Sequence, residues 1–239
     1  MKKFAFTLAE VLITLTIIGV ISAMVLPNML GHWEKKTLET QTKHFYSMLT
    51  LAIQNYMADQ HVDDLADTSI SCNYNWDNCR EAEEEVHNFI NKYLKVALKC
   101  RDEHDKHTCT QFKCNKYGNK SGLLYKVIDK RSDAYGCFYP DYILAHGYAI
   151  RMQPADAYGT ASVQFDVNGT GGPNRGGRDL WDVYIYYDGS IDELSPEARA
   201  NEEYAKNRKE YRFERCKESS YDGSGCFAHF KDNGFKFDY

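Results

Sequence analysis

The residue with the clearest chemical consequence is Glu10, the single charged residue in an apolar stretch. The stretch runs from Phe6 to Leu26 and stops at Pro27. A carboxylate inside a bilayer costs on the order of a few kcal/mol unless it is paired. A buried carboxylate and a buried ammonium each cost much alone and less together. We therefore expect Glu10 to pair with a cation, and such a pair would set the register between two apolar helices.

A second group of ligand-type side chains lies in the glycine-rich segment 166–179 and just beyond it. Its members carry hard oxygen atoms: Asp166, Asn168, Thr170, Asp179 and Asp182. Oxygen ligands on a tight turn suit Ca²⁺, so this segment suggests a Ca²⁺ site, although we expect no required cofactor. The segment departs from an EF-hand because Gly177 holds the twelfth position. The alternative is a structural turn in which Asp and Asn side chains accept hydrogen bonds from backbone amides.

Eight cysteines lie after the apolar stretch, and no two form a C-x-x-C pair. They are Cys72, Cys79, Cys100, Cys109, Cys114, Cys137, Cys216 and Cys226. An even number of cysteines without that motif indicates disulfides in an oxidising compartment, with the pairing left open. His104 and His107 among them make zinc a weaker alternative, because the spacing matches no common zinc pattern.

The rest of the sequence lacks the signatures of catalysis and of nucleic-acid binding. It contains no G-x-S-x-G, H-E-x-x-H or G-x-x-x-x-G-K motif, so we expect no enzyme. The net charge of −5 gives no support for nucleic-acid binding, which usually requires a basic face. The function is therefore expected in assembly or binding.

The element that carries Glu10 has the length of a membrane span. Residues 6–26 make a helix of about 32 Å at a rise of ~1.5 Å per residue, and a bilayer core is roughly 30 Å thick. Lys2 and Lys3 precede it, which predicts a cytoplasmic N-terminus and an exported remainder. We expect a single span in the inner membrane with an extracytoplasmic head.

The stretch after Pro27 predicts a continued, amphipathic helix to about residue 60. Its apolar positions recur at helical spacing: Leu38, Phe45, Leu49, Ala52 and Tyr56. We expect this half to pack on the head, and a separate core helix after a loop at 27–31 is the alternative. A second helix is predicted from Glu81 to about Leu98.

Three later segments have the composition of β-strands: Gly147–Gln153, Ala161–Val167 and Trp181–Tyr187. Glycine, proline and asparagine clusters separate them, and an antiparallel meander is the simplest arrangement. Residues 192–239 are polar and tyrosine-rich and cannot be placed on the sheet. The sequence thus predicts an α+β fold with a long N-terminal helix on a small antiparallel sheet and a disulfide-rich head.

The segment from Ala5 to Leu12, read together with Glu10 and Pro27, resembles the N-terminal motif of type IV prepilins and type II secretion pseudopilins. The resemblance covers about residues 1–55. It implies that prepilin peptidase cleaves between Ala5 and Phe6 and that Phe6 is N-methylated. It also implies that Glu10 pairs with the Phe6 amine of a neighbouring subunit and that Pro27 kinks the assembly helix. The alternative for Glu10 is pairing with the Phe6 amine of its own chain, one turn away. The family usually has glycine where this chain has Ala5.

The resemblance divides the chain into four parts: a leader (1–5), a transmembrane half-helix (6–26), an amphipathic half-helix (27–60) and a head (61–239). It predicts a structural subunit, a minor pilin or a pseudopilin, of a type IV pilus or a type II secretion-like filament. Its partners would be the peptidase and other pilin subunits. The alternatives are a displayed module for adhesion or DNA uptake, a plain signal anchor, and an exported enzyme that uses a prepilin-type anchor.

Overall fold

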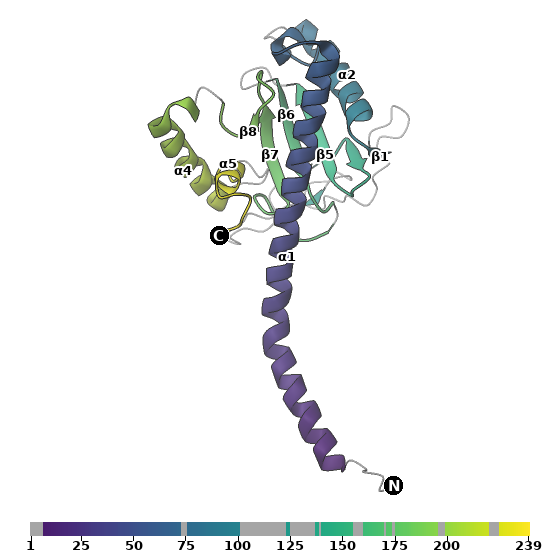
Figure 1. The fold of residues 1–239 in the computed structure, drawn as a ribbon, viewed down its shortest axis with the longest axis vertical. Coiled ribbons are helices and arrows are strands. Elements are labelled where there is room, and N and C mark those ends of the chain that lie inside the picture. The colour runs from purple at the N-terminus through teal and green to yellow at the C-terminus, as the bar shows by residue number, and fades with distance from the viewer. Residues whose placement is uncertain are drawn as a thin grey trace.

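A computed structural model describes residues 7–72, 76–100, 123–124, 137–138, 140–154, 160–169, 171–173, 175–195, 199–219 and 225–239. A single long helix projects from an α+β head, so that the N-terminal end of this helix lies far from the sheet (Figure 1). This arrangement confirms the predicted fold class.

Helix α1 (Leu8–Gln60) is continuous over 53 residues. It passes through Pro27 and Gly31 without a break, so no separate core helix forms. The predicted apolar face of the C-terminal half is correct: Leu38, Phe45, Leu49, Ala52 and Tyr56 are all buried. Thr42 and Ile53 complete the buried face. The helix ends at His61, whose backbone is left-handed and whose N–H bonds to the last turn.

A short 3-10 helix, η1 (Leu65–Asp67), leads to helix α2 (Trp76–Tyr93). The predicted second helix was wrong at both ends, because α2 starts earlier and Val96–Lys99 forms strand β1. The N–H of Cys100 donates to Asp141 and the carbonyl of Lys95 accepts from Ala145, so this segment pairs with the sheet. The spacing of Tyr93, Leu94 and Ala97 also fits a helix, and only the sheet partner distinguishes the two.

The main sheet has six strands in the order β1-β4-β5-β6-β7-β8, and every neighbouring pair is antiparallel. Its remaining strands are β4 (Tyr142–Leu144), β5 (Ala149–Pro154), β6 (Ala161–Asp166), β7 (Leu180–Ile185) and β8 (Ile191–Asp192). Strands β2 (Leu123–Leu124) and β3 (Cys137–Phe138) form a separate pair. The three predicted strands correspond to β5, β6 and β7, and the predicted meander is confirmed.

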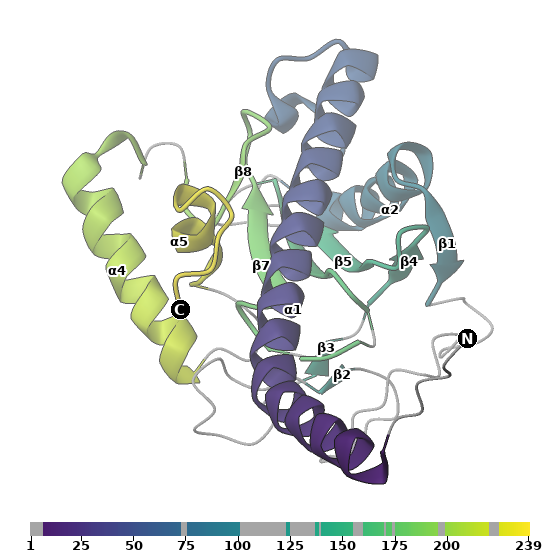
Figure 2. The same ribbon diagram turned by 60° about the horizontal axis from the view of Figure 1, so that its bottom comes forward.

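The core lies between α1 and one face of this sheet. Phe45 of α1 stacks on Phe165 of β6 with ring centroids 4.0 Å apart. Alternate residues of β6 and β7 point to this core, as Val163, Phe165, Trp181 and Val183 show by their burial. Figure 2 shows α1 crossing the sheet, with α2 on the side of β1 and the C-terminal helices on the side of β8.

The C-terminal residues enter this core. Helix α4 (Glu202–Ser219) and helix α5 (Phe227–Asp232) follow β8. Phe230 of α5 is fully buried and stacks on Trp181 at 4.8 Å. Beyond α5, the N–H of Phe237 donates to Glu39 Oε1 (2.9 Å) and Lys35 Nζ donates to the Tyr239 carbonyl (3.0 Å). The tail that the sequence left unplaced therefore ties α1 to the sheet.

Candidate functional site

The N-terminal half of α1 exposes apolar side chains over its whole length. The large ones are Leu8, Val11, Leu12, Ile13, Leu15, Ile17, Ile18, Val20, Ile21, Met24, Val25, Leu26, Met29, Leu30 and Trp33. By length and composition α1 is able to cross a membrane, and none of its apolar window is buried against the head. This surface needs an apolar surrounding, either lipid or other helices.

Glu10 lies in the first turn of α1 and forms a capping box with Thr7. Its Oε2 atom accepts from the backbone N–H of Thr7 (2.8 Å) and from the Thr7 hydroxyl (2.7 Å). The Thr7 hydroxyl in turn accepts from the backbone N–H of Glu10 (3.3 Å). The arrangement satisfies two backbone donors that a helix start leaves free. The predicted role of Glu10 did not include this contact, although the Thr-x-x-Glu pattern in the sequence signals it.

Two threonine hydroxyls in the apolar half are satisfied within the helix itself. Thr14 Oγ1 donates to the Val11 carbonyl (2.9 Å), and Thr16 Oγ1 donates to the Leu12 carbonyl (2.8 Å). Internally bonded hydroxyls cost little in a lipid environment. Glu10 Oε1 has no hydrogen-bond partner among the described residues, so this carboxylate keeps the capacity for one further polar contact.

Of the other predicted assembly residues, Pro27 is among those that the structure describes and Phe6 is not. Pro27 lies inside α1 and removes one backbone donor from the helix ladder. Figure 1 shows the axis of α1 curving between the head and the N-terminus. Ala5 and Phe6, the predicted cleavage and methylation residues, lie outside the described residues.

The residues predicted to bind Ca²⁺ lie where β6 leaves the sheet and β7 enters it. Asp166 Oδ1 accepts from the Asn168 N–H (2.8 Å), and Asp179 Oδ1 accepts from the Arg175 N–H (2.6 Å). The Val167 N–H donates to the Asp179 carbonyl (3.0 Å), so these two carboxylates come from adjacent backbone. Asp182 lies further along β7, opposite Gln164 in β6.

These contacts fit a structural turn, and they leave Ca²⁺ binding a prediction. Both buried carboxylates already accept hydrogen bonds from backbone N–H groups, as the alternative of a structural turn predicts. In the described part of the chain, no three His, Cys, Asp or Glu side chains gather closely enough to hold a metal ion. Thr170 lies outside the described residues. A Ca²⁺ ion held by Asp166 and Asp179 would need ligands from Asn168 or from backbone carbonyls.

The glycine-rich turn is fastened to the C-terminal segment through Arg178. The guanidinium lies over the rings of Phe237 (4.7 Å) and Tyr239 (4.9 Å) and donates to the Tyr239 carbonyl. Burial lowers the pKa of Arg178 from its usual value. The Tyr239 hydroxyl donates to the Gly177 carbonyl (2.9 Å), and burial raises the pKa of that phenol.

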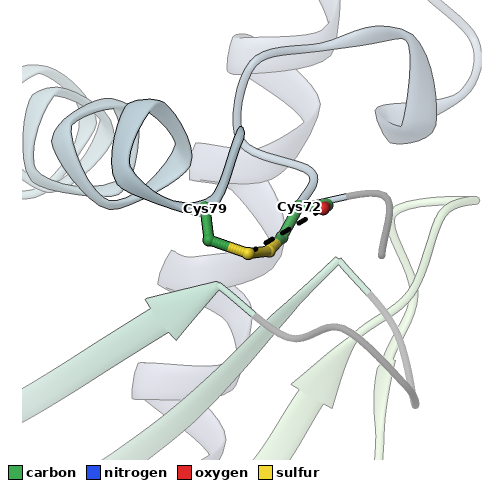
Figure 3. Close-up of a disulfide and its surroundings, with 2 residues drawn as sticks. All are labelled: Cys72 and Cys79. Atoms are coloured by element: carbon green, nitrogen blue, oxygen red, sulfur yellow. Dashed lines mark hydrogen bonds between the residues drawn. A yellow bond between two sulfur atoms is a disulfide. The ribbon is translucent and has the colours of Figure 1, made fainter. Parts of the chain in front are cut away.

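One disulfide is located between described residues. Cys72 and Cys79 are bonded, with Cα atoms 4.7 Å apart, and Figure 3 shows the bond joining the segment after η1 to the first turn of α2. Cys100 and Cys226 are also oxidised. Cys109 and Cys114 lie outside the described residues, and the side-chain positions of Cys137 and Cys216 are likewise outside them.

The comparisons with known proteins bear on the same helix. Residues 1–26 match the family described as the prokaryotic N-terminal methylation motif. A search of curated proteins found no match, and a search of solved structures found none. The chain carries a type IV prepilin-type motif on an exposed apolar helix and a pilin-like α+β head. The match over residues 1–26 supports a type IV pilin-like or pseudopilin-like precursor.

Proposed function

We propose that the chain is a structural subunit, a minor pilin or a pseudopilin, of a type IV pilus or a type II secretion-like filament. Prepilin peptidase cleaves it between Ala5 and Phe6 and methylates the new amine. The mature helix anchors the subunit in the inner membrane with its head outside, and then packs among the helices of other subunits. The observation that carries the proposal is a motif-bearing helix whose apolar half is entirely unpacked in the monomer.

The capping box suggests how Glu10 tolerates lipid before assembly. Within one subunit, Oε2 is satisfied by Thr7, which lowers the cost of placing a carboxylate in an apolar medium. An ammonium at Phe6 of a neighbouring helix would then take the remaining oxygen. A charge-assisted hydrogen bond of this kind is roughly twice as strong as a neutral one. Glu10 thus serves first as a helix cap and then as an intersubunit contact.

Processing is tested on the protein purified from membranes by N-terminal sequencing and mass spectrometry. The expected first residue is Phe6, one methyl group heavier than phenylalanine. An Ala5→Gly variant restores the residue that the family usually has and should be cleaved at least as fast, whereas Ala5→Leu should leave the leader attached. A chain cut after the apolar stretch would show a secretory signal peptide instead, and an uncut chain would show a plain signal anchor.

Assembly is tested by comparing Glu10→Gln with Glu10→Ala. Glutamine keeps the capping box but carries no charge, whereas alanine removes both. Cross-linking of neighbouring subunits in membranes should fall to background in both variants while cleavage before Phe6 continues. Normal assembly of Glu10→Gln would show that Glu10 acts only as a helix cap and would remove the proposed ion pair.

A second candidate function, a displayed binding module, is favoured by helix α4. Among its described side chains only Ala205 is buried, and Tyr204 and Tyr211 are about half exposed. Arg208 lies 5.9 Å from the Tyr211 ring, an arrangement on which bases of single-stranded DNA could stack. A gel shift with the purified chain and with Tyr204→Ala/Tyr211→Ala, repeated at several salt concentrations, tests this function. Equal binding of DNA by the wild type and the double variant would exclude α4 as the binding surface.

A further inference from the structure

Two histidines from separate elements meet on the surface of the head. His44 lies on α1, and His146 lies in the turn between β4 and β5. Their ring centroids are 5.0 Å apart and their planes are inclined by 59°. Both side chains are exposed, so the space between the rings opens to solvent. Neither residue belongs to the assembly helix half or to the glycine-rich turn discussed above.

The hydrogen bonds of the pair fix one ring and leave coordinating nitrogen atoms available. His44 Nδ1 lies 2.8 Å from the hydroxyl of Tyr148, whose ring is almost fully buried. In the tautomer in which Nδ1–H donates to this hydroxyl, Nε2 keeps its lone pair. In metal sites, the histidine nitrogen that does not bind the metal usually donates its N–H to a second group, and this hydrogen bond orients the ring. His146 has ring contacts with His44 and Tyr148 but no hydrogen bond to a described residue.

The separation of the rings matches a shared metal ion. Imidazole nitrogen binds Zn²⁺ at about 2.0–2.1 Å, and two rings on one tetrahedral ion then have centroids roughly 5 Å apart. Neutral imidazoles suit borderline ions such as Zn²⁺ and Cu²⁺ rather than Ca²⁺. With two protein ligands, water would complete the coordination.

We propose that His44 and His146 form a two-histidine site for a transition-metal ion of the Zn²⁺ or Cu²⁺ type, with Tyr148 as the positioning residue of His44. The ion would link α1 to the β4–β5 turn across the edge of the core. Phe45, the next residue of α1, packs edge-on against the Tyr148 ring at 5.7 Å. The metal would therefore strengthen the contact between the long helix and the sheet. This site is independent of the proposed filament function.

The experiment measures thermal unfolding of the full chain in detergent with added Zn²⁺ and separately with Cu²⁺. Binding to the folded state alone raises Tm in proportion to the logarithm of metal concentration. The wild type should show this rise, with Cu²⁺ acting at lower concentration than Zn²⁺. His44→Gln and His146→Gln should each abolish it, and Tyr148→Phe should weaken metal affinity about 10–100-fold, as loss of an outer partner does.

The chain supplies a matched control in His87. Its Nδ1 lies 2.9 Å from the Tyr142 hydroxyl, which is the same histidine–tyrosine contact without a second described histidine ring beside it. His87→Gln should keep the full metal-dependent rise. A rise that survives in His44→Gln and His146→Gln, or one that is absent from the wild type, would overturn the proposal. Nitrogen couplings from two imidazoles in the electron paramagnetic resonance spectrum of bound Cu²⁺ provide the second readout.

Discussion

At the scale of single residues, Phe45 joins the long helix to the sheet. Its side chain is fully buried, stacks on Phe165 at 4.0 Å and meets Tyr148 edge-on. Aromatic pairs of this geometry add about 0.5–1.5 kcal/mol to the free energy gained from burial. The neighbouring Leu51 of the same helix is 58% exposed and has no part in this contact.

Phe45→Ala should lower the free energy of unfolding by about 3–5 kcal/mol, because it removes a buried ring and leaves a cavity. Leu51→Ala is the matched control on the same helix and should change it by less than about 0.5 kcal/mol. Denaturant unfolding of both full-length variants in detergent measures the difference. Similar losses in the two variants would contradict the assignment of Phe45 to the core.

At the scale of elements, an ion-pair network fastens the C-terminal helices to the sheet edge. Arg199 bonds to Asp192 of β8 (2.5 Å) and to Asp232 of α5 (3.0 Å), and Lys231 of α5 also reaches Asp192 (2.9 Å). Lys209 of α4 pairs with Asp232. Burial by itself raises the pKa of Asp232, but Lys209 and Arg199 outweigh burial and hold that pKa below its usual range.

The network predicts acid sensitivity in the packing of α4 on α5. A carboxylate with a lowered pKa in the folded state stabilises above its unfolded pKa, about 3.9, and loses that contribution as the pH falls through the folded value. Asp232→Asn should therefore be less stable than wild type at pH 6, by about 0.2–1 kcal/mol because the pairs are partly exposed. The gap in Tm should close below about pH 4. A gap that is constant with pH would exclude this carboxylate as its cause.

The disulfide between Cys72 and Cys79 is a second interaction that stabilises the arrangement of elements. It closes a short loop that leads from η1 into α2, and Cys72 is buried. By chain entropy a loop of this length contributes about 2–3 kcal/mol. The Cys72→Ser/Cys79→Ser double variant should lose this amount in equilibrium unfolding under oxidising conditions. Loss of less than about 0.5 kcal/mol would show that the unfolded chain is not restrained by this bond.

At the scale of the whole molecule, the glycine-rich turn, the C-terminal segment and α1 meet at the base of the head. Arg178 contacts Phe237 and Tyr239, while Glu39 and Lys35 hold the same segment from the helix. A ligand bound at the turn would therefore stabilise the joint between the head and the long helix.

The calcium hypothesis predicts that Ca²⁺ raises the Tm of the full chain and that a chelator lowers it. Asp179→Asn should remove the shift, because asparagine retains the acceptor for Arg175 but lacks the charge. Asp188→Asn is the control, since Asp188 makes the same kind of turn contact with Ser190 (2.9 Å) away from the site. Absence of any Ca²⁺ effect on the wild type would establish the structural turn and remove the calcium assignment.

The local pattern of the sequence determined the elements that depend on neighbours in the chain. Helical spacing identified the buried face of α1, and alternation identified β5, β6 and β7, because each period follows from backbone geometry alone. The apolar run with Glu10 and the motif matched over residues 1–26 are local in the same way, and they support a pilin-like precursor. The motif residues Ala5 and Phe6 and the pairing of Glu10 across subunits stay predictions.

Only the tertiary structure decided which distant segments share a surface. Val96–Lys99 became a strand because β4 lies beside it, and the polar tail entered the core because Phe227 and Phe230 fit against Trp181. His44 and His146 are separated by about a hundred residues, and no local pattern links them. The contact of Thr7 with Glu10 is local, and the Thr-x-x-Glu pattern signals it although the predicted role of Glu10 did not include it. Contacts between elements depend on the summed packing of the whole chain, which no short window contains.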